Sequence, residues 1–591
     1  MTARRAGSGR RRSSPLTGRR RPGGSPARRL VSLLAALALG LSGIFARLIL
    51  LQVRDASAYT ALARDQRVRE VNVPATRGKI LDRNGRALAL SVPALAVYAD
   101  PSLVVDALGE ARTIAADLRL HSNDIFAKLT SPGTFTYLAR GVGLETASAL
   151  RARHLPGIGF LSESRREYPS GDLASQVLGV VGVDGEGLGG LELHYSAELA
   201  GQAGRAVLES DPSGMLIPQG TYVDTPPTAG DDLMLTIDTA IQFQAQAALA
   251  RAVRQNKAKG GTVIVIDPAT GEILAMTSYP SFDASDLAHA TAEQERNRAV
   301  TDVYEPGSVN KVVAVAAALE EGTLTLNQRL RVPQTYESYG HVFRDVHTHP
   351  TEQMTLGDIV AFSSNVGAIQ VAGGLGDDTF YSYLERFGLT SRTGIDFPGE
   401  VDGVIDPVDQ WNGLSMATIP IGQGIAVTPL QMAQVYATIA NGGMWIQPHL
   451  VRETIGPDGE IHPVPTAASR RVVSAETASA VAQMLAYAVS VGTGQAAQIA
   501  EFWVAGKTGT AEKVRADGQG YGDKFVASFI GFTPASRPAL VVAAILDEPV
   551  TEYGGVAAAP LFQQIASFAL TRLHVPPAPP LPRPPHAVKP G

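Results

Sequence analysis

A serine and a lysine three residues apart form the first candidate for nucleophilic chemistry in this chain. The segment Glu305-Pro-Gly-Ser308-Val-Asn-Lys311 places both side chains at the start of a predicted helix, one turn apart on the same face. The helix continues as VVAVAAAL, which is apolar on every side and therefore predicts burial. Because burial lowers the pKa of a lysine, Lys311 is a candidate base for the Ser308 hydroxyl. One Ser-x-x-Lys also arises by chance, so other elements must support this interpretation.

A hydroxyl and an amide lie two residues apart in the segment Phe362-Ser363-Ser364-Asn365. On a tight turn both can point into one cleft, where Ser363 could relay a proton and Asn365 could hold a substrate amide. The alternative is that these residues only cap the helix that follows.

A third candidate is the segment Lys507-Thr508-Gly509-Thr510, on a predicted strand. Glycine in the middle of a strand often marks the close approach of another backbone. An edge strand of this kind suits an extended peptide, which would pair with the backbone while Lys507 and Thr508 hold its carboxylate. The alternative is an exposed edge strand that a lysine protects from aggregation.

The surrounding sequence predicts an α+β domain with one antiparallel sheet flanked by helices. A hairpin is predicted from 262–266 and 272–276, and three further strands are predicted at 503–511, 525–532 and 539–546. The predicted helices lie near 240–255, 309–321, 355–372, 428–440, 474–489 and 560–573.

Residues 54–235 contain few side chains suited to catalysis. A helix is predicted for 55–70, and an extended stretch from Val71 ends at the hairpin turn Asn84-Gly85 before a second strand begins. Residues 100–160 mix short helices and loops, and another extended stretch starts at Arg165. The region therefore predicts an elongated, non-catalytic α+β module.

An apolar segment near the amino terminus predicts one membrane span. Residues 30–53 contain a single charge, Arg47, and approach the roughly 20 residues that a helix needs to cross a bilayer. Residues 1–29 contain ten arginines and no acid, so the positive-inside rule places them in the cytoplasm and the remainder outside. The alternative is a cleaved signal peptide, but its apolar core would be about 7–15 residues long.

Composition excludes several classes of protein. With 45% hydrophobic residues, the chain can form substantial cores, so wholesale disorder is excluded. The absence of cysteine excludes disulfides, a thiol nucleophile and thiolate metal sites. The net charge of −5 argues against a nucleic-acid-binding protein.

Taken together, the three motifs occur in the order Ser-x-x-Lys, Ser-x-Asn and Lys-Thr-Gly, and this order resembles the signature of penicillin-binding proteins and β-lactamases. From about Arg47 to Leu573 the chain is identified by resemblance as a class B penicillin-binding protein of the septal, FtsI type. The segments that carry the likeness outside the three motifs are Arg77-Gly-Lys-Ile-Leu-Asp-Arg-Asn-Gly85, Tyr168-Pro, Gly190-Leu-Glu192, Thr301–Glu305, Gly422-Gln-Gly424, Thr428–Gln431 and Tyr553-Gly-Gly.

The resemblance implies an α+β architecture with a single transmembrane helix, a pedestal of the dimerisation type and a transpeptidase fold with a five-stranded sheet. The expected segments are an arginine-rich cytoplasmic tail (1–29), a transmembrane helix (30–52), the pedestal (53–235), the transpeptidase domain (236–575) and a disordered Pro-rich tail (576–591).

It also implies a role for each candidate residue. Ser308 would attack the carbonyl between the terminal D-alanines of a peptidoglycan stem peptide, with Lys311 as its base and Ser363 as a proton relay. The expected substrate-binding residues are Asn365, Lys507, Thr508, Gly509 and Thr510, and the N–H groups of Ser308 and Thr510 would form the oxyanion hole. β-Lactams would acylate Ser308.

No metal, organic cofactor or nucleic acid is expected, and the implied partners are the membrane, a glycan polymerase in it and other divisome proteins. Three alternatives remain. The chain could be an elongation-type transpeptidase, a hydrolase such as a carboxypeptidase or β-lactamase, or a membrane-anchored sensor that has kept the fold.

Overall fold

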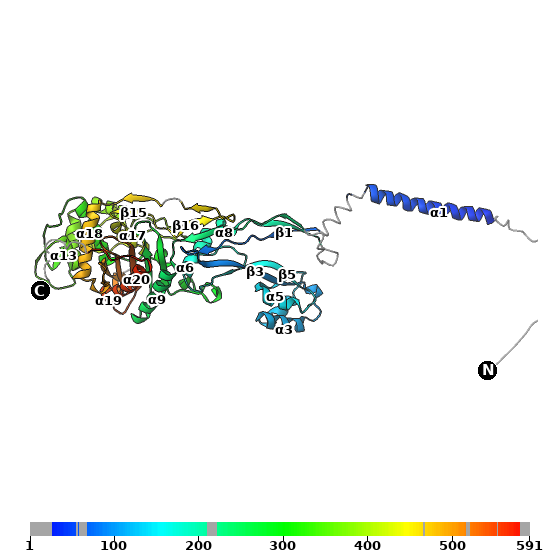
Figure 1. Ribbon diagram of the computed structural model, residues 1–591, viewed down its shortest axis with the longest axis horizontal. Coiled ribbons are helices and arrows are strands. Elements are labelled where there is room, and N and C mark those ends of the chain that lie inside the picture. Colours follow the sequence, from blue (N-terminus) through cyan, green and yellow to red (C-terminus); the bar gives the residue numbers. More distant parts are fainter. Residues whose placement is uncertain are drawn as a thin grey trace, which may run out of the picture. The chain divides into compact units, whose positions relative to one another are not determined.

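The structure is a computed structural model that describes residues 26–54, 57, 68–209, 222–464, 467–515, 520–551 and 553–579 (Figure 1). The chain divides into two units, one of Met1–Val73 with Arg205–Pro226 and one of Pro74–Gly204 with Pro227–Gly591. The predictions for the tail at 1–29 and the Pro-rich end at 576–591 fall mostly outside the described residues.

The first unit contains the apolar helix and a small sheet. Helix α1 (Pro26–Ile49) continues as a π-helix over Leu50–Arg54, and together they are long and apolar enough to cross a membrane. The predicted span at 30–52 lies inside this helix. Strands β1 (Val68–Val73), β6 (Gly204–Glu209) and β7 (Tyr222–Thr225) form a three-stranded sheet. Of the helix predicted for 55–70, the last three residues belong instead to β1.

In the second unit, strands from distant parts of the sequence form a seven-stranded sheet. Its strands are β17 (Ile461–Pro463), β16 (Val451–Ile455), β8 (Asp232–Leu235), β2 (Ile80–Leu81), β3 (Ala87–Ala99) and β4 (Thr136–Gly143), in that order, with β5 (Ile158–Glu167) paired to β3. Since β16 and β17 come from the region predicted as the transpeptidase domain, the sheet extends across the predicted boundary at 235.

Three local predictions for the pedestal need correction. The extended stretch from Val71 to Gly85 is split, because β1 pairs with β6 whereas β2 pairs with β3 and β8. The stretch predicted from Arg165 ends at Glu167, and Ser175–Leu178 form a short helix, α6. Strand β4 was missed within 100–160. The predicted turn at Asn84-Gly85 is confirmed, with Gly85 at φ +81°.

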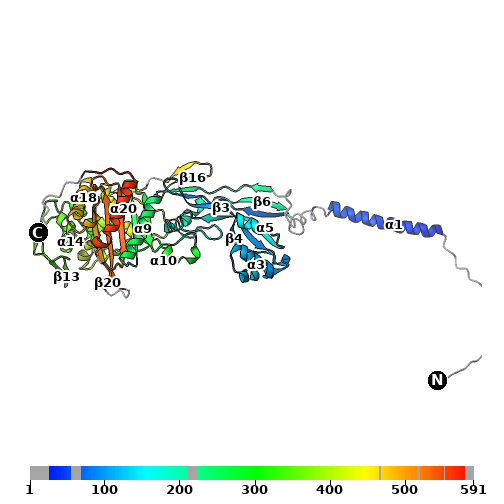
Figure 2. The same cartoon turned by 60° about the horizontal axis from the view of Figure 1, so that its bottom comes forward.

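Short helices pack against the pedestal strands and enclose a small separate core. They are α3 (Ala107–Leu118), α4 (Ser122–Leu129) and α5 (Leu144–Arg151), and their buried side chains share one core with residues of β3 and β4; Figure 2 shows α3 and α5 beside these strands. Within each helix the buried positions recur at helical spacing, as Ala111 and Ile114 do in α3, and Ile125 and Leu129 in α4.

The predicted five-stranded antiparallel sheet is confirmed. Its order is β10 (Ile273–Tyr279), β9 (Gly260–Ile266), β21 (Leu540–Asp547), β20 (Tyr521–Thr533) and β19 (Ala505–Val514), which leaves β19 at an edge. Successive residues of β9 enter opposite cores, as the two-residue period of a strand requires: Val263 and Val265 one, Ile264 and Ile266 the other.

Helices cover both faces of this sheet. On one face lie α9 (Thr239–Gln255) and α20 (Ala559–Arg572), which pack against each other beside the strands (Figure 2). The other core contains α12 (Lys311–Glu320), α13 (Leu356–Ala361), α14 (Asn365–Gly373), α17 (Pro429–Ala440) and α18 (Ala475–Ser490). The single helix predicted over 355–372 is therefore wrong, because residues 362–364 interrupt it.

Candidate active site

Ser308 lies where a short 3₁₀ turn (Gly307–Asn310) leads into α12. Glycines allow this turn to approach its neighbours closely. Gly307 has φ +60° and donates its N–H to the carbonyl of Gly422, and a Cβ on Gly307 would lie 2.8 Å from the carbonyl oxygen of Thr510. The turn is therefore held between the 422–424 loop and the edge strand β19.

Lys311 begins α12 and is buried, as the all-apolar continuation predicted. Its side chain is 1% exposed, and residues 311–318 are all buried. The Nζ atom donates to the carbonyl oxygen of Ser363 at 2.6 Å, to Asn365 Oδ1 at 2.7 Å and to Ser363 Oγ at 3.2 Å. Burial holds the pKa of Lys311 well below its usual value, and the charge of Lys507 lowers it further.

Ser363 connects Ser308 to this lysine. Its hydroxyl donates to Ser308 Oγ at 2.9 Å, so the chain of contacts runs from Ser308 through Ser363 to Lys311. Ser363 has φ +61°, a left-handed backbone conformation that costs energy for a residue with a Cβ and that clusters at functional sites. This turn is what separates α13 from α14.

The alternative that the 363–365 segment serves only as a helix cap is too simple. Ser364 is the cap of α14, accepting the N–H of Gly367 at 2.8 Å, which leaves the hydroxyl of Ser363 for Ser308. Asn365 is the first residue of α14. Its Oδ1 accepts from Lys311, and its Nδ2 donates to the carbonyl of Arg344 at 2.9 Å. In this arrangement Asn365 positions the lysine.

The Lys507-Thr508-Gly509-Thr510 segment lies on the edge strand β19. Lys507 is only 1% exposed, so the alternative of an exposed protective lysine is wrong. Its Nζ contacts Thr508 Oγ1 at 3.2 Å, and burial lowers its pKa to about 7. A Cβ on Gly509 would lie 3.0 Å from the carbonyl of Pro306, which confirms the predicted close approach of another backbone. Thr510 Oγ1 accepts the N–H of Gly554 at 3.2 Å.

The structure adds two residues that the sequence did not indicate. The buried carboxylate of Asp345 accepts from Ser364 Oγ at 2.6 Å and from the N–H of Val366 at 2.9 Å, so it fixes the start of α14. Thr493 Oγ1 lies 2.7 Å from Thr508 Oγ1, and its N–H donates to the carbonyl of Ala361. Only the glycines on both sides of Thr493 could have signalled a constrained loop.

Within the described ranges, no group of three histidine, aspartate or glutamate side chains is arranged to hold a metal ion. Two amines with lowered pKa values and two hydroxyls in hydrogen-bond contact suit acyl transfer through a serine.

Comparison with known proteins agrees with this geometry. Residues 261–567 match the penicillin-binding protein transpeptidase domain, and residues 72–235 match the penicillin-binding protein dimerisation domain. The chain is 36% identical over 573 residues to penicillin-binding protein PbpB of Mycobacterium tuberculosis, covering 90% of this chain and 84% of PbpB. It is 34% identical over 559 residues to peptidoglycan D,D-transpeptidase FtsI of Escherichia coli K12, covering 93% and 92%.

Solved structures give the same result. The crystal structure of penicillin-binding protein 3 from Mycobacterium tuberculosis in complex with aztreonam matches with a TM-score of 0.70 at 32% identity, covering 86% of this chain and 99% of that chain. The same protein in complex with ampicillin matches with a TM-score of 0.70 over 87% of this chain and 99% of that one. The chain belongs to the class B penicillin-binding proteins, with a dimerisation domain and a transpeptidase domain.

Proposed function

We propose that this protein is a peptidoglycan D,D-transpeptidase that cross-links stem peptides during septal wall synthesis. The observation that carries the proposal is the contact chain from Ser308 through Ser363 to the buried Lys311, beside a second buried lysine on the edge strand. The septal role follows the relatives, which include FtsI and PbpB.

The surroundings of Lys311 suit a neutral amine that accepts a proton. A neutral amine has two N–H donors and one lone pair. The two shortest contacts of Lys311 Nζ are to oxygens that can only accept. One is the main-chain carbonyl oxygen of Ser363, and the other is the side-chain amide oxygen Oδ1 of Asn365. These contacts occupy the two N–H groups, so the lone pair faces Ser363 Oγ.

Acylation then follows from the order of these groups. The Ser308 hydroxyl rotates to donate to Ser363, and Ser363 donates to the lone pair of Lys311. As Ser308 Oγ forms a bond to the carbonyl carbon between the terminal D-alanines, its proton passes through Ser363 to Lys311. Return of a proton to the leaving nitrogen releases D-alanine and leaves an acyl-enzyme. The N–H groups of Ser308 and Thr510 stabilise the oxyanion.

The edge strand holds the donor peptide for this attack. An extended peptide pairs with β19, and its terminal carboxylate meets the ammonium of Lys507 and the hydroxyls of Thr508 and Thr510. Gly509 leaves room for the nucleophile turn. An amine from a neighbouring stem peptide then attacks the acyl-enzyme, Ser308 Oγ leaves with a proton, and a new amide bond joins the two strands.

Location and partners belong to the same proposal. The apolar helix at 26–54 anchors the protein by a single pass, with the arginine-rich tail in the cytoplasm and the catalytic domain outside. A glycan polymerase in the membrane and other divisome proteins would be its partners. β-Lactams such as those bound to the mycobacterial relative would acylate Ser308 in place of the peptide.

Intact-mass spectrometry of the full-length protein with a fluorescent penicillin tests the proposal. We expect one stable adduct that maps to Ser308 and that is absent from a folded Ser308→Ala variant. Rapid turnover of the adduct would indicate a hydrolase. A folded protein that forms no adduct would indicate a scaffold, and an adduct retained in Ser308→Ala would refute the nucleophile.

A further inference from the structure

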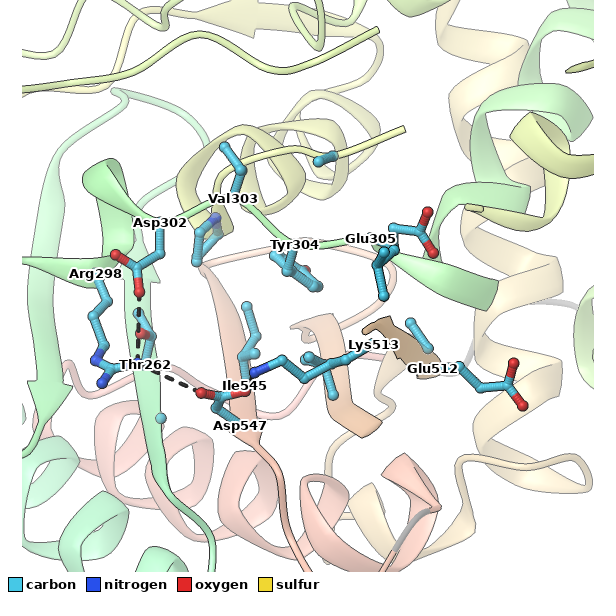
Figure 3. A pocket seen from close by; sticks show the side chains of 16 residues that line it. Thr262, Arg298, Asp302, Val303, Tyr304, Glu305, Glu512, Lys513, Ile545 and Asp547 are labelled. Atoms are coloured by element: carbon cyan, nitrogen blue, oxygen red, sulfur yellow. Dashed lines mark hydrogen bonds and ion pairs between the residues drawn. The ribbon is translucent and has the colours of Figure 1, made fainter. Parts of the chain in front are cut away.

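Carboxylates in the transpeptidase domain have two different kinds of counter-charge. At the end of the core sheet, Arg298 lies between Asp302 and Asp547 and forms ion pairs with them at 3.5 and 3.6 Å (Figure 3). An arginine keeps its charge throughout the physiological pH range, so these carboxylates are always compensated. Asp345, whose carboxylate holds the start of α14, differs from them. Among the described residues its only ion-pair partner is His349, at 3.0 Å.

His349 lies in the loop between β13 (His341–Arg344) and β14 (Glu352–Met354), and its side chain is only 12% exposed. The side chain of Gln334 fixes this loop at two points. Its Oε1 accepts the N–H of His349 at 2.8 Å, and its Nε2 donates to the carbonyl oxygen of Asp345 at 2.9 Å. The histidine is therefore held beside Asp345 by main-chain contacts as well as by its ring.

Both ring nitrogens of His349 face oxygen atoms that accept hydrogen bonds. Nδ1 lies 2.6 Å from the carbonyl oxygen of Pro350, and Nε2 lies 3.0 Å from Asp345 Oδ2. Both carboxylate oxygens of Asp345 already accept from the start of α14, including the hydroxyl of Ser364, as an ionised carboxylate does. The ring must then donate from both nitrogens, and only an imidazolium can do so. Burial alone would lower the pKa of His349, but these two acceptors and the charge of Glu352 raise it.

Asp345 connects this histidine to the catalytic groups in two ways. Its carboxylate holds the start of α14, and the adjoining residues Ser363 and Asn365 contact Lys311 Nζ. Its charge also acts on the lysine. Burial and the charge of Lys507 lower the pKa of Lys311, whereas the charge of Asp345 raises it. A cation next to Asp345 offsets that charge and so favours the neutral amine.

Resting on the proposed function, in which Lys311 accepts the proton of Ser308, we propose that His349 is a positioning residue that acts through Asp345. As an imidazolium it keeps the carboxylate on the start of α14 and offsets the negative charge beside the lysine. The charged groups that act on the ring, Asp345 and Glu352, are both negative, and α14 has no charged residue that could replace the cation. Without it, Asp345 keeps Lys311 protonated up to a higher pH and so delays its use as a base.

The pH profile of acylation by a fluorescent penicillin tests this inference on the full-length protein, from about pH 5 to about pH 8. The second-order rate should rise with pH as Lys311 loses its proton. His349→Gln keeps a side-chain donor but removes the charge, so we expect the rise to move up by about one pH unit. Below the midpoint the rate is then about tenfold lower than in the wild-type protein. His349→Lys restores a cation and should return the rise to the wild-type pH.

Titration of the Lys311 amine by NMR measures the same shift without penicillin. We expect its pKa to be higher by about one unit in His349→Gln than in the wild-type protein. Thermal unfolding at each pH shows that the variants are folded.

His289→Gln is the matched control, because His289 also pairs with an aspartate, Asp286 at 2.8 Å, but its side chain is 83% exposed. It should leave the profile and the titration unchanged. Superimposed profiles of the wild-type protein and His349→Gln would overturn the inference. So would a rate loss that is equal at every pH or that His349→Lys does not recover. Failure of the proposed function would look different, because the wild-type protein would then form no penicillin adduct at any pH while the titration still showed the shift.

Discussion

Two regions of this molecule bury positive charge in opposite ways. In the pedestal, the guanidinium groups of Arg77 and Arg166 are 7% and 3% exposed, and both pair with the fully buried carboxylate of Glu192, at 2.6 and 2.7 Å. In the transpeptidase domain, Lys311 and Lys507 are equally buried, but neither has a carboxylate within ion-pair distance among the described residues.

The difference separates a structural use of buried charge from a chemical one. A buried ion pair keeps its charges, and removal of one partner is strongly destabilising because it leaves an uncompensated buried charge. A buried amine without a counter-ion has a lowered pKa, which costs stability but supplies a base. We therefore expect pedestal substitutions to affect stability and lysine substitutions to affect acylation.

The largest effect should come from Lys311→Met. The substitution keeps an aliphatic side chain in the buried site and removes the proton acceptor, so we expect acylation by a fluorescent penicillin to slow by about 10²–10⁴-fold without loss of thermal stability. Lys259→Met, at a 59% exposed lysine side chain, is the control. Acylation of Lys311→Met at close to the wild-type rate would show that Lys311 is not the proton acceptor.

Next in size is Glu192→Gln. This change leaves two buried guanidinium groups without a counter-charge, so we expect a loss of about 3–5 kcal/mol in the free energy of unfolding. Asp184→Asn, which removes an exposed partner of Arg140, should cost about 0–1 kcal/mol. Denaturation of both variants measures the difference. Equal losses, or a loss of acylation in a fully stable Glu192→Gln, would contradict a structural role for the pair.

Lys507→Arg should change the pH profile of acylation. With a pKa of about 7, Lys507 loses its charge as the pH rises above that value, so it holds a substrate carboxylate less well at alkaline pH. We expect the wild-type second-order rate of acylation to fall above about pH 7, by up to about tenfold per pH unit. Arginine stays protonated, so the fall should be absent from the variant. An identical alkaline decline in both proteins would exclude Lys507 as its source.

The smallest effect is expected for Ser364→Ala. Loss of this helix cap should cost about 1 kcal/mol, as should loss of the equivalent cap Ser474 of α18. Because Ser364 lies between Ser363 and Asn365, only its replacement should also slow penicillin acylation, by less than about tenfold. If Ser474→Ala slows acylation equally, the effect of Ser364→Ala on acylation does not come from its position between Ser363 and Asn365.

The parts of the site that depend on local spacing could be predicted from the sequence. Ser308 and Lys311 are one helical turn apart, and the apolar run after them predicted the burial of the lysine. The core strands were also predicted, from a turn between two short apolar runs and from further runs at hairpin spacing. The left-handed backbone of Ser363 could not be predicted, because tertiary contacts hold it there and no glycine marks it.

Features that depend on contacts between residues far apart in the sequence could not be predicted for a different reason. Asp345 reaches the site only because the chain folds back onto α14, and β1 and β2 separate only because their partners β6 and β8 lie far along the sequence. No local pattern records either pairing. The shared sheet that joins β8 to β16 was missed for the same reason.

Titration of the lysine side chains by NMR directly tests whether an unpaired buried amine serves as the base. The chain has nine lysines, so isotope labelling of this residue type gives few signals, and Lys311→Met and Lys507→Met assign the two that matter. We expect both amines to have pKa values far below the usual value near 10.4, that of Lys507 being about 7. Titration of Lys311 near 10.4 would contradict it.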